Sequence, residues 1–168
     1  MTKPTYVLGT GLSHDGSACL LKDGEIRFAI EKERVTRIKH DGGGDSEAIR
    51  YCLNAEGIKL NDLSLIVQNA NFGAFEYGNA YYKTAKRILD EKCQVPVVTI
   101  SHHLAHAYSA LAMSPFEEMG ILVIDGCGSA FDEVIDNNCT VDAAKPASDC
   151  KHLWFEKDSF YLYRGGRL

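Results

Sequence analysis

Two short turns, each containing an Asp-Gly pair, divide the start of the chain into three apolar segments. Residues 6–11 and 17–21 flank the turn at 12–16, and the turn at 22–25 separates the second segment from residues 26–31. Asp-Gly suits turn positions that need a positive φ, and residues 26–31 alternate apolar with polar side chains as a strand does. We therefore predict that the chain opens with three antiparallel strands.

Further along, helical and strand-like segments alternate, which predicts an α/β fold. A helix over residues 46–56 is capped by Asp45 or Ser46 and stops at Gly57. Ser101 is a suitable N-cap for a helix over 102–113, which Ser114-Pro115 ends. We also expect a helix over 80–92, buried strands over 63–68, 95–100 and 121–124, a charged connector over 33–41, loops over 71–79 and 127–148, and a strand over 160–163 that enters the Gly165-Gly166 turn without a returning strand.

Length and charge restrict the classes of function. The 168 residues suffice for one domain, and the formal net charge is −5 with no Lys/Arg-rich run. Nucleic acid and anionic membranes are therefore poor partners. No apolar stretch approaches the ~20 residues of a membrane helix, and residues 1–6 lack a signal-peptide core. We predict a cytoplasmic protein whose six cysteines, none with CxxC spacing, stay as free thiols.

Three histidines within five residues begin the helix predicted over 102–113. His102 and His106 are four residues apart and share a helix face, whereas His103 points about 100° away. Asp125 follows a predicted strand and could complete the set. Two imidazoles and one carboxylate suit Fe(II), with Zn or Mn as alternatives. Spacing alone leaves two possibilities equally open, a metal site or structural histidines that cap or line a loop.

Two glycine turns could bind phosphate, because glycine lets backbone N–H groups approach an anion closely. The first contains Asp15, Gly16 and Ser17, and the second contains Gly126, Gly128 and Ser129. Neither is a P-loop, and each alone is more typical of an ordinary turn. As a pair they resemble the phosphate loops of the actin-like ATPase fold. Lys39 could reach an anionic ligand, or could simply belong to a solvated connector.

Four strings in the same order resemble the O-carbamoyltransferases of the nodulation-factor and antibiotic-tailoring type. They are residues 11–18 (GLSHDGSA), 33–40 (ERVTRIKH), 101–107 (SHHLAHA) and 124–126 (IDG). The resemblance implies an actin-like ATPase (ribonuclease H-like) fold, of which the chain would hold the first lobe only: a three-stranded antiparallel meander followed by parallel strands and helices. It implies an N-terminal domain similar to the tRNA threonylcarbamoyl-transfer protein, of which residues 1–168 would be the N-terminal part.

The resemblance also implies a chemistry. Such enzymes make carbamoyladenylate from carbamoyl phosphate and ATP, and pass the carbamoyl group to a hydroxyl of a small acceptor. It places an iron-type metal on His102, His106 and Asp125, and puts His14 and Lys39 at the transfer site. Family members are several times longer, so we expect a fragment, which a separate chain that supplies the missing domains could complete.

Three alternatives stay open. The chain could belong to a threonylcarbamoyl or hydrogenase-maturation type of carbamoyl transferase, which shares the His-x-x-x-His logic. It could be a sugar or acetate kinase, which would need no histidine pair. It could also be a non-catalytic, truncated module that binds metal or nucleotide.

Overall fold

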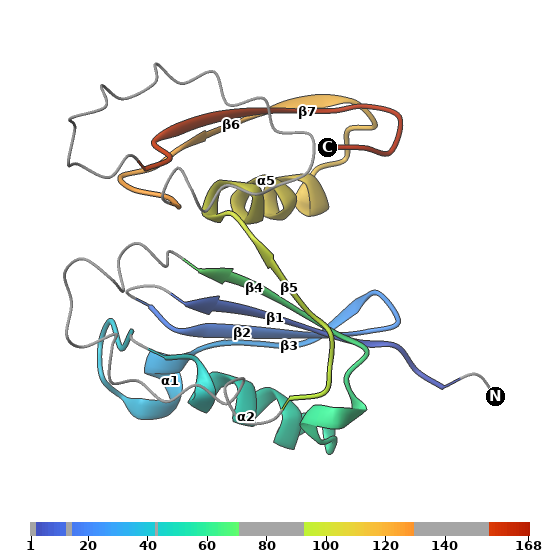
Figure 1. Ribbon diagram of the computed structural model, residues 1–168, viewed down its shortest axis with the longest axis vertical. Coiled ribbons are helices and arrows are strands. Elements are labelled where there is room, and N and C mark those ends of the chain that lie inside the picture. The colour runs from blue at the N-terminus through green and yellow to red at the C-terminus, as the bar shows by residue number, and fades with distance from the viewer. Residues whose placement is uncertain (1–2, 13–14, 43, 71–92, 130–154) are drawn as a thin grey trace. The chain divides into compact units, whose positions relative to one another are not determined.

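The computed structural model describes residues 3–12, 15–42, 44–70, 93–129 and 155–168 (Figure 1). The described residues divide into two compact units. The first unit comprises the described residues up to Ala70 and those from 93 to Thr99, and the second unit comprises those from Ile100 to Leu168. The helix predicted over 80–92, the loop over 71–79 and most of the irregular stretch over 127–148 lie outside the described residues.

A five-stranded sheet organises the first unit, with the strand order β3-β2-β1-β4-β5. β1 pairs antiparallel with β2 and parallel with β4, and β2 pairs antiparallel with β3. Asp23 and Gly24 have the positive φ that their turn requires. The predicted α/β class with an opening antiparallel meander is therefore confirmed. The strands are β1 Tyr6–Leu12, β2 Ser17–Lys22, β3 Glu25–Glu31, β4 Leu65–Ala70 and β5 Val97–Ile100.

Helix α2 (Ser46–Glu56) covers one face of this sheet, as Figure 1 shows. Its apolar residues recur at helical spacing, so they form one buried stripe. The helix ends at Gly57, which takes the left-handed conformation expected of a C-terminal stop. A short 3₁₀ helix, Leu60–Asp62, follows. The core lies between the sheet and α2 and includes Leu8, Leu20, Ala48, Ile49, Cys52, Leu53 and Ile66.

The prediction of a connector over residues 33–41 is wrong in its first part, because the chain forms helix α1 (Lys32–Thr36) there. The backbone N–H of Lys32 donates to the carbonyl of Gly16 at 2.7 Å, which anchors the start of the helix to the first hairpin turn. Arg37 then ends the helix in the left-handed conformation. A contact between residues so far apart in sequence leaves no trace in the local pattern.

The second unit contains helix α5 (His102–Met113) and a two-stranded antiparallel sheet of β6 (Met119–Ile124) and β7 (Asp158–Tyr163). The Ser101 hydroxyl accepts from the Leu104 N–H at 3.2 Å, so the predicted N-cap of α5 is confirmed. The strand predicted over 160–163 does have a partner, because it pairs with β6, which precedes it in the chain.

Two strands predicted to be buried are not. Val97 and Val98 of β5 are 43% and 46% exposed, and Leu122 and Ile124 of β6 are 62% and 71% exposed. In the described part of this unit, only alternate residues of β6 pack against α5, because a two-stranded sheet with one covering helix buries one face. A short apolar run cannot distinguish that arrangement from a strand covered on both faces.

Among the described residues, none of the helices is both long and apolar enough to cross a membrane. Four cysteines of the described part are free thiols: Cys19, Cys52, Cys93 and Cys127.

Candidate metal centre

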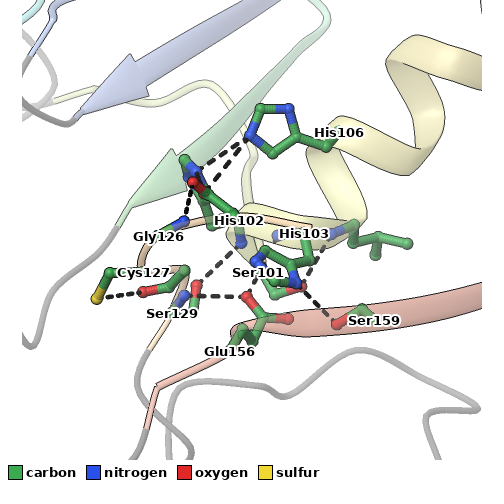
Figure 2. A network of polar contacts seen from close by, with 12 residues as sticks. Ser101, His102, His103, His106, Gly126, Cys127, Ser129, Glu156 and Ser159 are labelled. Carbon is green, nitrogen blue, oxygen red and sulfur yellow. Dashed lines mark hydrogen bonds and ion pairs between the residues drawn. The ribbon is translucent and has the colours of Figure 1, made fainter. Parts of the chain in front are cut away.

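The first turns of α5 and the loop after β6 bring His102, His106 and Asp125 together within the second unit. The Asp125 Oδ2 atom lies 2.9 Å from His102 Nε2 and 3.9 Å from His106 Nε2. The two Nε2 atoms are 3.2 Å apart, and Figure 2 shows the His106 ring turned toward His102. Three potential ligand atoms therefore lie within 4.8 Å of one another, as a shared cation would require.

This donor set fits a borderline divalent metal. Two imidazole nitrogens and one carboxylate oxygen leave coordination positions open for water or substrate. His106 is about half exposed and Asp125 about one third exposed, so the open side of the group is accessible to a ligand. The sequence predicted this convergence from the four-residue spacing and from the position of Asp125 after its strand.

The protonation states also favour a cation. Partial burial lowers the pKa of His102, and the neighbouring His106 ring lowers it further, while Asp125 acts in the opposite direction. Burial would raise the pKa of Asp125, but the Gly126 N–H, at 2.6 Å, and His102 together outweigh it and lower that pKa. A neutral imidazole and an ionised carboxylate are the forms in which these groups bind metal.

His103 takes no part in this group. Its side chain is fully buried, and its Nδ1 atom lies 2.8 Å from the Ser159 hydroxyl on β7. Its backbone N–H donates to Glu156 Oε2 at 3.2 Å. This position agrees with the helical geometry, which turns His103 away from the face that His102 and His106 share.

The second glycine turn has its N–H groups engaged within the chain. Gly126 N–H donates to the Asp125 side chain, Gly128 N–H to the Glu156 carbonyl at 2.7 Å, and Ser129 N–H to Glu156 Oε2 at 2.9 Å. A phosphate bound to these three groups would have to displace those partners. Phosphate binding by Gly126, Gly128 and Ser129 stays a prediction.

The first glycine turn lies in the first unit and packs against Asp41 and Gly44. Gly16 N–H donates to the Asp41 carbonyl at 3.2 Å, and a Cβ atom at Gly16 would lie only 2.3 Å from the Gly44 carbonyl oxygen. Glycine is therefore required here for close backbone packing. Ser17 begins β2, and phosphate binding by Asp15, Gly16 and Ser17 likewise stays a prediction.

Asp15 is part of a second group that could hold a cation. Its Oδ1 atom lies 3.0 Å from His40 Nδ1, and the His40 N–H donates to Glu33 Oε2 at 3.0 Å. Lys39 is exposed beside a surface hollow of about 420 Å³ that it lines with Glu33, Arg34 and Arg37. His14 lies outside the described residues.

Sequence reasoning did not find Glu156 or Ser159. Glu156 precedes β7 and Ser159 lies at its start, where no local spacing or motif marks a functional residue. Their partners are 27 to 56 residues away in sequence, so only the fold shows the connection.

Known proteins similar to this chain support the predicted family. Residues 7–76 match the family model described as Carbamoyltransferase N-terminus. The chain is 35% identical over 137 residues to the nodulation protein NolNO of Sinorhizobium fredii, covering 68% of this chain and 20% of that protein. It is 33% identical over 158 residues to an uncharacterized protein of Synechocystis, covering 74% and 26%. The chain thus spans about a quarter or less of the length of these curated relatives.

Among solved structures, YeaZ from Pseudomonas aeruginosa is 18% identical, with a TM-score of 0.45, and the match covers 72% of this chain and 55% of that one. A second structure from Pseudomonas aeruginosa, of a protein with similarity to YeaZ, is 17% identical with a TM-score of 0.44, and the match covers 72% of this chain and 54% of that one.

The predicted resemblance to the carbamoyltransferases is confirmed by the family match and by the NolNO identity.

Proposed function

Because residues 7–76 match the carbamoyltransferase N-terminus, we propose that this chain provides the N-terminal part of an O-carbamoyltransferase. The reaction moves a carbamoyl group from carbamoyladenylate, made from carbamoyl phosphate and ATP, to a hydroxyl of a small molecule in the cytoplasm. The structural observation that carries the proposal is the approach of Asp125 to both His102 and His106. The remaining domains would come from residues or chains beyond those described.

His102, His106 and Asp125 would hold a divalent cation, with Fe(II) preferred and Zn or Mn as alternatives. When bound, such a cation supplies Lewis acidity to an oxygen of the carbamoyl donor. The neutral His102 ring contributes its Nε2 lone pair, and Asp125 supplies one negative charge.

Two residues outside this group would act on the transferring groups. In the proposed reaction, His14 accepts the proton of the attacking hydroxyl at a ring nitrogen or orients the acceptor, since a neutral imidazole suits both tasks near pH 7. Lys39, whose ammonium is exposed, stabilises the negative charge that develops on the phosphate leaving group.

The proposed metal site is tested by elemental analysis of the purified chain after loading with Fe(II) in the absence of oxygen. We expect about one equivalent of metal bound by His102, His106 and Asp125 in the wild type, and the loss of that metal in both His102→Ala and His106→Ala. His40→Ala reports separately on the second candidate group, because any metal held by Asp15, Glu33 and His40 would be lost in that variant and kept in the other two. Undiminished metal in both His102→Ala and His106→Ala would remove the site.

The proposed reaction is tested by following radiolabel from carbamoyl phosphate, with ATP present, to small hydroxylated acceptors or to tRNA. The chain is assayed alone and together with a NolNO chain from which the region that matches this chain has been removed. We expect label on the small acceptor only with both parts present, and loss of transfer in His14→Ala and Lys39→Ala. Label on tRNA alone would contradict an O-carbamoyltransferase of small molecules.

A further inference from the structure

A single carboxylate joins the two segments that carry the proposed metal ligands. Glu156 Oε2 accepts the Ser129 N–H at 2.9 Å and the His103 N–H at 3.2 Å. Ser129 belongs to the loop after β6, and His103 lies in the first turn of α5. Figure 2 shows the Glu156 side chain between these segments, at the beginning of the helix.

Ser129 extends this connection to a metal ligand. Its buried hydroxyl accepts the backbone N–H of His102 at 2.9 Å, while its own N–H is held by Glu156. The position of the His102 backbone therefore depends on Ser129, and the position of Ser129 depends on the Glu156 carboxylate.

The same segment also fixes the loop that carries Asp125. Asp125 N–H donates to the Lys157 carbonyl at 2.9 Å, Gly128 N–H to the Glu156 carbonyl at 2.7 Å, and Glu156 N–H to the Ser129 carbonyl at 2.9 Å. Backbone hydrogen bonds thus hold the Asp125 loop along residues 156–157, and the Glu156 side chain connects this loop and its own segment to α5.

The backbone approaches closely at this point. A Cβ atom at Gly128 would lie 2.8 Å from Glu156 Oε2 and 2.7 Å from His103 Cδ2. Only glycine leaves room for the carboxylate and the buried imidazole together. A carboxylate at this place is also favoured by the partial positive charge of a helix N-terminus.

We propose that Glu156 is a positioning residue for the metal group: its carboxylate holds the Asp125 loop against the first turn of α5, and so keeps Asp125 at His102. This inference rests on the proposed metal site. Groups that orient metal ligands without touching the ion commonly change metal affinity by about 10- to 100-fold when removed.

The test is a titration of the whole chain with Co²⁺, followed by the visible absorption of the bound ion. We expect Glu156→Ala to weaken Co²⁺ binding by about 10-fold or more and to change the absorption spectrum. Glu156→Gln keeps an oxygen that can accept both N–H groups, so it should recover most of the affinity. Glu118→Ala is the matched control, because this exposed glutamate of the second unit pairs with Arg164 away from the site.

The thermal unfolding temperatures of the metal-free variants separate a positioning role from a loss of general stability. A positioning role changes the Co²⁺ spectrum even in a variant that unfolds at the same temperature as the wild type. If Glu156→Ala does not fold, Ser129→Ala carries the test, because it removes the oxygen that holds the His102 N–H and should weaken binding. Wild-type affinity and spectrum in a folded Glu156→Ala variant, or in Ser129→Ala where Glu156→Ala does not fold, would overturn the proposal for Glu156 and leave the metal site standing. A wild-type chain that binds no Co²⁺ would overturn the metal site and this proposal together.

Discussion

Each of the two units, taken by itself, is stabilised by a different kind of internal contact. In the first unit, strands and helix α2 share one apolar core, with Leu8, Leu20, Ile49 and Ile66 fully buried. In the described part of the second unit, the buried apolar residues are three, Ala107, Ile121 and Val123. The start of α5 there is fixed instead by its backbone N–H groups, which donate directed hydrogen bonds to the side chains of Ser101, Ser129 and Glu156. Burial of apolar side chains therefore dominates the stability of the first unit, and individual hydrogen bonds dominate the geometry of the second.

The largest effect is expected from a cavity in the first unit. Ile49→Ala should lower the free energy of unfolding by about 2–5 kcal/mol, because it removes fully buried methyl groups from a packed core. Urea denaturation measures this loss. Leu122→Ala, at an exposed apolar residue of the second unit, should change stability by no more than about 0.5 kcal/mol. Equal losses in the two variants would break the contrast between the units.

In the second unit, a single methyl group should be costly at one glycine and tolerated at another. Gly128→Ala places a Cβ against Glu156 and His103, and should destabilise the unit by about 1–3 kcal/mol. Gly126→Ala is the control, because its Cβ would meet nothing within 4 Å. Hydrogen exchange at the amides of His103 and Ser129 should accelerate in the first variant only, and similar exchange in both would contradict the close packing.

A smaller loss is expected at the cap of α5. Ser101→Ala removes the hydroxyl that accepts the Leu104 N–H and should cost about 0.5–2 kcal/mol, whereas Ser101→Gly should cost only a few tenths. Hydrogen exchange of the Leu104 amide reports the loss of the cap directly. Protection that is unchanged in Ser101→Ala would show that the cap contributes nothing.

The smallest effect concerns an ion cluster on the first unit and depends on pH. Hydrogen bonds from Lys22, and then from Arg27 and Tyr6, outweigh burial and lower the pKa of Glu56 below 4.5. A lowered folded-state pKa stabilises the protein above the unfolded-state value, and that stability is lost as the pH falls through the folded-state pKa. Glu56→Gln should therefore be less stable than the wild type at pH 7, and the difference should shrink as the pH falls below 4.5. A difference that stays constant down to pH 3 would contradict an ionic origin.

The sequence predicted the features that depend on neighbours in the chain. Asp-Gly turns and alternating residues fixed the three-stranded opening, Ser101 marked the start of α5, and the four-residue spacing placed His102 beside His106. Features that depend on distant partners were missed. Helix α1 is anchored by the Gly16 carbonyl, and the Glu156 carboxylate serves residues 27 and 53 positions away. No local pattern encodes contacts of that range.

The most direct test of the metal site is X-ray absorption by the chain loaded with one equivalent of Zn²⁺. If His102, His106 and Asp125 hold the ion, the spectrum should show two imidazole nitrogens at about 2.0–2.1 Å together with oxygen ligands. His106→Ala should reduce the imidazole count to one. A spectrum with thiolate or purely oxygen ligands, or one that His106→Ala leaves unchanged, would contradict the site.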